Sequence, residues 1–266
     1  MDRTVGCELG ITTHREAEVE LQVAVARTPG LAVDERLTLL HEGRELPTVE
    51  VATPHDGRLH LVTLPEGVTR VSYEARVRGV AEMPEPSPAE ISLYRRPSRY
   101  VQSDTLLGFA AAEFAGLRDA DLLRAVTSWV GTRLSYVPGS SGPTDGATET
   151  LLAGAGVCRD YAHLVVALLR ALDVPARLAA VYAPGCDPMD FHAVVEAHVS
   201  GGWYAVDATA LAPRSSLVRI ATGRDAADTA FMTTNSGRTD LDSTRVTAIA
   251  DDGLPEDDGT GLVRIG

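Results

Sequence analysis

The stretch GAGVCRDYAHLVVALLRALDVPARLAAVYAP, residues 154–184, decides the fold. Cys158 follows a turn of small residues, and the residues from there to Leu172 carry more apolar side chains than one face of a surface helix needs. We therefore predict a central, buried helix that begins at Cys158. Pro175 ends this helix, because a proline disfavours the helical conformation of the residue before it.

Cys158 lies where a helix can activate a thiol. The first turn of a helix presents unpaired backbone N–H groups and the positive end of the helix dipole, and both favour thiolate over thiol. The Cys158 backbone N–H points into the same space and could bind an oxyanion. Asp160, near the helix start, is expected to accept local backbone N–H groups and to be structural. A lone cysteine is more often a small core residue, so Cys158 needs a base beside it.

A second stretch, DFHAVVEAHVSGGWYAVDAT, residues 190–209, predicts two strands that could supply this base. The strands, 191–199 and 203–207, are joined by the tight turn Ser200-Gly201-Gly202. Antiparallel pairing about residue 201 sets Val195 opposite Asp207, and His192 lies a few residues away. A hydrogen bond between His192 and Asp207 is therefore expected, since a buried imidazole must be satisfied.

Other histidines compete for the role of base. Four belong to a predicted N-terminal sandwich, and His163 is rotated about 140° from Cys158 on the same helix, which indicates a structural role. His198 remains the alternative to His192. It lies nearer the turn, about 20 Å from His192 along the strand. The four histidines of the sandwich are His14, His41, His55 and His60.

The residues in these two stretches resemble the core of the transglutaminase-like superfamily. That family has a Gly-x-Cys-x-Asp-x-Ala segment, a helix ending in Leu-x-x-Pro-Ala-Arg, a His-Ala strand and a Trp strand followed by Asp-x-Thr. Two departures are Val194, where many members have an aromatic residue, and Ala208, where proline is common. The matching residues are Gly156, Cys158, Asp160 and Ala162; Leu172, Pro175, Ala176 and Arg177; His192 and Ala193; Trp203, Asp207 and Thr209.

The resemblance implies a fold and a chemistry. The implied fold is a papain-like α+β core, with the nucleophile at the start of a central helix packed on an antiparallel sheet. The implied triad is Cys158, His192 and Asp207, and the implied reaction attacks a glutamine-like or peptide amide, releases the amine and forms an acyl thioester. No cofactor and no metal is required. The resemblance is to bacterial members, whose N-terminal region is rich in β-strands.

The flanking sequence predicts two domains. Apolar and polar residues alternate from Thr4 to Val80, with turn signals about every ten residues, as in an antiparallel β-sandwich. The proline-rich stretch MPEPSPAEISLYRRP, residues 83–97, marks the boundary. We predict a β-sandwich over residues 1–96 and a catalytic core over 97–266. The part beyond about Asp225 is less patterned and is expected to be a tail of that core, with residues 251–259 as a solvated acidic loop.

Composition limits the partners. The chain of 266 residues has 24 Lys+Arg against 37 Asp+Glu, a net charge of −13, which disfavours nucleic acid and anionic membranes. The N-terminus lacks the basic start and apolar stretch of a signal peptide, so we expect a cytoplasmic protein. The 3 cysteines are scattered, which argues against a disulfide framework or a zinc site. The expected partner is a protein or peptide substrate, and the sequence does not give the oligomeric state.

Three functions fit the sequence. The first is hydrolysis of an amide or peptide through a Cys158 thioester, with water as the default acceptor. The second is transamidation to an amine, and the third is a binding or scaffold protein with an inherited triad that no longer turns over. A second oxyanion donor is expected upstream of the helix, at Trp129 or Tyr136, and for both residues core packing is the alternative.

Overall fold

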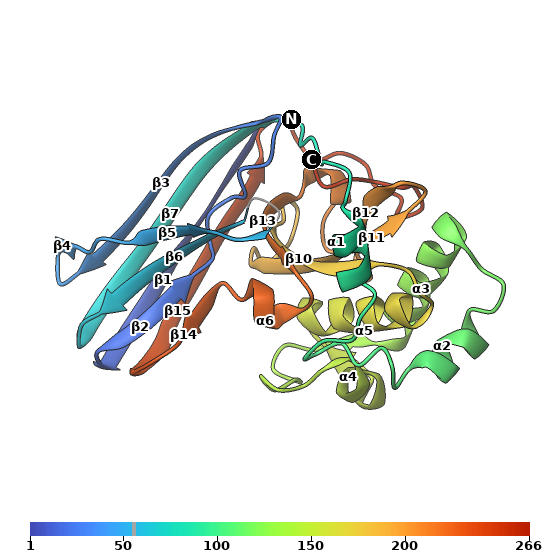
Figure 1. The fold of residues 1–266 in the computed structure, drawn as a ribbon. Coiled ribbons are helices and arrows are strands. Elements are labelled where there is room, and N and C mark those ends of the chain that lie inside the picture. Colours follow the sequence, from blue (N-terminus) through green and yellow to red (C-terminus); the bar gives the residue numbers. More distant parts are fainter. Residues whose placement is uncertain (55–56) are drawn as a thin grey trace.

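Alternating apolar side chains build one side of the molecule from two antiparallel sheets (Figure 1). The computed structural model describes residues 1–54 and 57–266, so His55 lies outside the described residues. Val5, Cys7, Leu9 and Ile11 are buried, and they meet apolar side chains of the facing sheet in one core. The larger sheet has the order β15-β1-β7-β3-β4 and contains β1 (Arg3–Arg15), β3 (Leu31–His41), β4 (Arg44–Glu45), β7 (Gly67–Gly79) and β15 (Arg238–Ala250). The smaller sheet has the order β14-β2-β6-β5 and contains β2 (Ala17–Leu21), β5 (Val49–Ala52), β6 (Arg58–Leu64) and β14 (Met232–Thr234).

The chain beyond Asp225 is more regular than its sequence predicted, because it contains two strands of the sandwich. Strand β14 pairs with β2, and β15 pairs with β1 from end to end, so residues 232–250 belong to the sandwich. The alternation was hard to see because β15 is an edge strand and most of its side chains are exposed; only Val246 and Ala248 are buried. The acidic segment that follows is mainly exposed, but Asp257 holds the Arg214 guanidinium at 2.7 Å.

The other side of the molecule is an antiparallel sheet covered by helices (Figure 1). Helix α5 (Cys158–Ala171) lies centrally against this sheet, and all of its residues from Asp160 to Ala171 are buried. This confirms the predicted central helix. The sheet has the order β12-β11-β10-β13 and contains β10 (Ala176–Tyr182), β11 (Phe191–Val199), β12 (Gly202–Val206) and β13 (Val218–Gly223). The remaining elements are α1 (Pro88–Leu93), α2 (Leu107–Glu113), α3 (Asp119–Arg133), α4 (Ala147–Ala153), η2 (Arg214–Ser216), α6 (Ala226–Thr229), and the short parallel pair β8 (Ser135–Tyr136) and β9 (Ala155–Gly156).

The two sides share buried surface. The segment 23–26, which follows β2, is fully buried and runs against the sheet of β10 to β13, called the catalytic sheet below for the site predicted on it. Tyr182 on β10 donates its hydroxyl to the Val23 carbonyl at 2.8 Å, and the Ala26 N–H donates to the Arg219 carbonyl at 2.9 Å. The sandwich is therefore fixed against the sheet that carries the predicted histidine. In the part of the chain that the structure describes, no helix is long and apolar enough to cross a bilayer.

Candidate active site

Cys158 is the first residue of α5, and its approach is shaped by two glycines. Gly154 ends α4 with a φ of +65°, a conformation that favours glycine. A Cβ on Gly156 would lie 2.6 Å from the Asp160 Cβ, so only glycine fits there. Asp160 accepts the Val157 N–H at 2.8 Å, as expected for a capping residue. These contacts set the sulfur at the start of the helix, where it is partly exposed.

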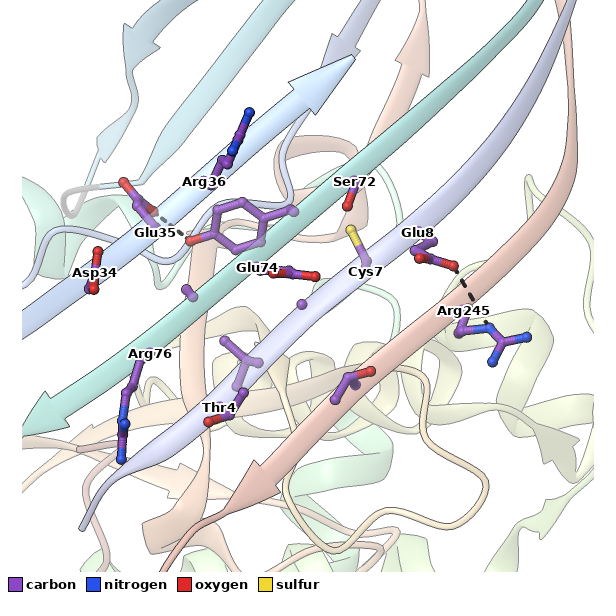
Figure 2. A pocket seen from close by; sticks show the side chains of 15 residues that line it. Thr4, Cys7, Glu8, Asp34, Glu35, Arg36, Ser72, Glu74, Arg76 and Arg245 are labelled. Atoms are coloured by element: carbon purple, nitrogen blue, oxygen red, sulfur yellow. Dashed lines mark hydrogen bonds and ion pairs between the residues drawn. The ribbon is translucent and has the colours of Figure 1, made fainter. Parts of the chain in front are cut away.

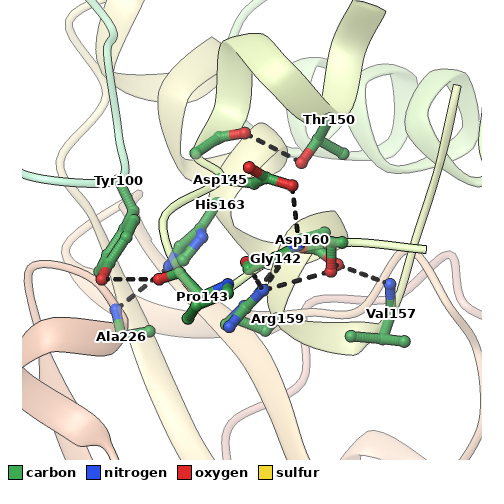
Figure 3. A network of polar contacts seen from close by, with 12 residues as sticks. Tyr100, Gly142, Pro143, Asp145, Thr150, Val157, Arg159, Asp160, His163 and Ala226 are labelled. Atoms are coloured by element: carbon green, nitrogen blue, oxygen red, sulfur yellow. Dashed lines mark hydrogen bonds and ion pairs between the residues drawn. The ribbon is translucent and has the colours of Figure 1, made fainter. Parts of the chain in front are cut away.

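Asp160 and Arg159 also hold the loop that precedes the nucleophile (Figure 3). The Ser141 hydroxyl donates to Asp160 Oδ2 at 2.6 Å, and Arg159 donates to the Gly142 carbonyl at 2.9 Å. Tyr100 donates its hydroxyl to the Pro143 carbonyl at 3.0 Å on the other side of the loop. The loop is thus tied down at three successive residues beside Cys158.

His192 and Asp207 form the predicted pair. The Nε2 atom of His192 lies 2.9 Å from Asp207 Oδ2, with His192 4% and Asp207 8% exposed. The register places Val195 opposite Val206, one residue from the predicted pairing with Asp207. The second carboxylate oxygen of Asp207 accepts the backbone N–H and the hydroxyl of Thr209, at 2.9 and 2.6 Å. Both oxygens are satisfied, so the carboxylate is held in one orientation.

The pKa values describe a charged pair in contact with the sulfur. Burial by itself lowers the pKa of His192, but hydrogen bonds to Asp207 and to the Cys158 side chain, and the charges of both, raise it well above its usual value. Burial raises the pKa of Asp207, but His192 and Thr209 lower it below its usual value. Since Nε2 faces the carboxylate, Nδ1 is the atom that takes the proton of the Cys158 thiol and holds it in the charged form. The structure thus brings together Cys158, His192 and Asp207.

Tyr136 reaches the same site from β8, and it is partly exposed. Burial raises the pKa of Tyr136 to about 12, a charge on Cys158 also raises it, and a hydrogen bond from the Cys158 backbone N–H opposes this. The phenol therefore stays protonated at neutral pH. Its oxygen lies beside the N–H that was expected to bind an oxyanion.

Trp129 does not reach the site, and its prediction as an oxyanion donor is wrong. Its indole N–H donates to Glu113 Oε1 at 2.9 Å, and its ring packs against Phe109 and Phe114. The residue belongs to the apolar stripe of α3, which the core needs. Core packing was the alternative reading, and it is the correct one here.

The other candidate histidines have structural surroundings. His163 is fully buried, stacks on Tyr100 at 5.3 Å and accepts the Ala226 N–H at 3.1 Å (Figure 3). Burial lowers the pKa of His163 to about 4, so the ring is neutral. His198 pairs across the hairpin with Trp203, away from the end of β11 that carries His192. His192, in contrast, lines the same cavity as Cys158.

Two hollows of similar size contain a cysteine. One, about 470 Å³, lies on the larger sheet of the sandwich and contains Cys7 (Figure 2). Burial raises the pKa of Cys7 to about 11, and no histidine is among the described residues that line this hollow. The other cavity, also about 470 Å³, contains both Cys158 and His192. Only this second cavity joins a cysteine to a base.

Comparisons with known proteins agree with this geometry. The model of the transglutaminase-like superfamily matches residues 111–208, which span α3 to Asp207. The crystal structure of a "Putative Cysteine Protease" from Cytophaga hutchinsonii is 31% identical, with a TM-score of 0.88, over 98% of this chain and 96% of that one. This chain belongs to the transglutaminase-like superfamily. Members of the superfamily are usually cysteine enzymes, which supports a cysteine-dependent enzyme here.

Curated relatives match over shorter spans. An uncharacterized protein of Mycobacterium leprae is 31% identical over 130 residues, which are 44% of this chain and 46% of that protein. An uncharacterized protein of Mycobacterium bovis is 38% identical over 84 residues, 31% of this chain and 26% of that protein. The chain therefore spans half or less of the length of the curated relatives it matches.

Sequence reasoning missed the residues that the sandwich brings to the site. Gln22 follows β2, and Phe231 and Met232 lie at the start of β14, yet all three line the cavity of Cys158. No motif marks them, because their role depends on how the sandwich packs against the catalytic sheet. Tyr100 was also missed; its stacking on His163, its bond to the Pro143 carbonyl and its place in the cavity lining reveal it.

Proposed function

We propose that the chain is a cysteine hydrolase that cleaves a peptide or glutamine-like amide through a thioester on Cys158. One observation carries the proposal: His192 bonds the buried Asp207 carboxylate at 2.9 Å and shares one cavity with Cys158. A nucleophile, a base and a carboxylate that orients the base are the parts that such a reaction needs.

The reaction runs through two steps of acyl transfer. His192 Nδ1 takes the thiol proton, and the sulfur attacks the carbonyl carbon to form a tetrahedral oxyanion. The C–N bond then breaks, the amine leaves with the proton from His192, and an acyl thioester remains on Cys158. Water attacks the thioester with His192 as base, and the carboxylic acid leaves as the sulfur regains its proton.

Two donors are available for the oxyanion. The Cys158 backbone N–H is one, and the Tyr136 hydroxyl, which contacts that N–H, is the other. A substrate oxygen that accepts a hydrogen bond from this N–H would also lie near the Tyr136 hydroxyl, which could donate a second one. Donors fixed in place before the reaction stabilise the charge that develops on the oxygen.

The proposal is tested with glutamine-containing peptides and a labelled primary amine. Release of acid, and no incorporation of the amine, supports hydrolysis; incorporation would show transamidation instead. Cys158→Ala is the control, because every product must depend on the sulfur. If wild type and Cys158→Ala give the same products, the chain does not act through this cysteine.

A further inference from the structure

The cavity beside Cys158 is built by both sides of the molecule. The catalytic sheet contributes Leu178, Phe191 and Ile220, from three different strands. Phe231 and Met232 reach it from the sandwich side. Phe191 directly precedes His192, and its ring stacks on that of Phe231 at 4.6 Å. The wall next to the catalytic base is therefore completed by the sandwich.

The walls are mainly apolar, and the charges near them already have partners. Arg159 lines the cavity, but its guanidinium is engaged by Asp160, Ser141 and the Gly142 carbonyl. Asp190 is exposed, and its carboxylate accepts the Phe191 N–H at 2.7 Å. These two residues carry opposite charges, so the cavity as a whole favours neither an acidic nor a basic side chain.

One amide lies among the apolar residues. Gln22 is 3% exposed and lines the cavity, and its Nε2 donates to Thr53 Oγ1 at the long distance of 3.4 Å. Its carboxamide oxygen accepts no hydrogen bond from the residues that the structure describes, and an N–H of a bound chain could fill this position. An apolar pocket with one such polar group suits a side chain that is carried on a peptide.

We infer that this cavity binds one large apolar side chain of a peptide substrate, at a residue flanking the attacked amide. The inference rests on the proposed hydrolase function and adds the substrate class to it. Leu, Met and Phe side chains fit the apolar walls. Asp and Lys fit less well, because a charge placed against the apolar walls loses its water, and the Arg159 guanidinium is already paired with Asp160.

The test measures hydrolysis of Ala-based peptides with a central glutamine, in which one flanking position at a time carries Leu, Phe, Asp or Lys. Release of ammonia or of a new amino terminus is followed for each peptide. At one position, Leu or Phe should raise kcat/KM at least about tenfold over Asp and Lys. Equal rates at every position would overturn the inference.

Two cavity variants and one control variant test whether this preference depends on the cavity. Met232→Glu should remove the preference, whereas Val49→Glu, on the same sheet but 63% exposed, should retain it. Phe231→Ala, which removes one stacked ring, should weaken the preference and serves if Met232→Glu does not fold. A preference that both cavity variants retain would also overturn the inference.

Failure of the proposed function gives a different result. Iodoacetamide is too small to need the cavity, so its rate with Cys158 should be the same in wild type and Met232→Glu. If no peptide is hydrolysed and Cys158 reacts no faster than Cys7 and Cys186, the hydrolase itself is excluded, and the substrate class falls with it.

Discussion

Asp207 decides which nitrogen of His192 can act as a base. Its carboxylate faces Nε2 and is itself held by Thr209, so the ring keeps its proton on Nε2 and presents Nδ1 to the sulfur. An amide in place of the carboxylate could hold the ring in the opposite tautomer. The role of Asp207 is therefore orientation and charge compensation.

Asp207→Asn should lower kcat/KM for amide hydrolysis by about 10³–10⁴, as expected when a triad histidine is held in the wrong tautomer. Steady-state kinetics on any accepted peptide measures this loss. Asp240→Asn is the matched control, because Asp240 bonds the exposed His14 on the sandwich and should leave the rate unchanged. A loss below about tenfold for Asp207→Asn would contradict the assigned role.

Tyr136→Phe removes one hydroxyl and should lower kcat about 10²–10³, as for loss of an oxyanion donor. KM should change little, since the bond is made mainly in the transition state. Alkylation of Cys158 by iodoacetamide forms no oxyanion and should keep its rate. A variant that loses alkylation and hydrolysis together would point to a structural role for Tyr136.

The raised pKa of His192 predicts how stability depends on pH. A raised pKa in the folded state means that the contribution is fully present below about pH 6.5, the value for an unfolded histidine, and is lost as pH rises through the folded pKa. The difference in unfolding free energy between wild type and His192→Gln should therefore shrink as the pH rises above about 6.5. Urea unfolding at several pH values measures it, and a difference that grows with pH would contradict the assignment.

At the scale of elements, the hairpin β11–β12 and the start of α5 were predicted from the sequence, since their apolar periodicity and turn residues are strong local signals. The register was displaced by one residue, because the symmetric turn fixes the pairing only approximately. His192 and Asp207 still form a hydrogen bond despite this one-residue difference, because both lie at the open end of the hairpin, away from its turn. The sequence left two positions open for Trp129, the core and the site, because an apolar side chain on a helix suits either one.

Glu196 on β11 forms buried ion pairs with two arginines of the same sheet. It is 1% exposed and pairs with Arg177 at 2.9 Å and with Arg219. Burial raises the pKa of Glu196, but the charges of both arginines lower it to about 2. Glu196→Gln removes the carboxylate that Arg219 pairs with, whereas Arg177 keeps its ion pair with Glu90 at 2.9 Å.

Glu196→Gln should lower the unfolding free energy by about 3–5 kcal/mol, the cost of breaking a buried ion pair. Urea denaturation measures the change. Glu74→Gln, on the exposed face of β7, is the control and should stay within about 0.5 kcal/mol of wild type. Equal stabilities of the two variants would show that the buried network contributes little.

In the whole molecule, the last strand, β15, pairs with the first, β1, although the residues of the helix-covered sheet lie between them in the sequence. The sequence predicted the sandwich from its first strands, but it did not predict that β15 joins β1, since pairing across the length of the chain leaves no local signal. The cavity was missed for the same reason. Both follow from packing between segments that lie far apart in the sequence.

Ala248→Asp tests this closure of the sandwich. Ala248 is 2% exposed on β15, and a carboxylate there should lower the unfolding free energy by more than about 2 kcal/mol. Ile249→Asp, at the next position on the opposite face and 46% exposed, should change it by less than about 0.5 kcal/mol. Thermal unfolding of the two variants gives the comparison, and similar effects would mean that β15 does not pack as described.

If Cys158 carries the acyl group, mass spectrometry of the protein treated with a p-nitrophenyl ester of an N-acylated leucine should detect that group on this residue. We expect a burst of nitrophenol, an acyl adduct on the peptide that contains Cys158, and loss of that adduct with time as water hydrolyses it. Cys158→Ser should show neither the burst nor the adduct on a comparable time scale. An adduct confined to Cys7 or Cys186, or ester hydrolysis that Cys158→Ser leaves unchanged, would contradict the account.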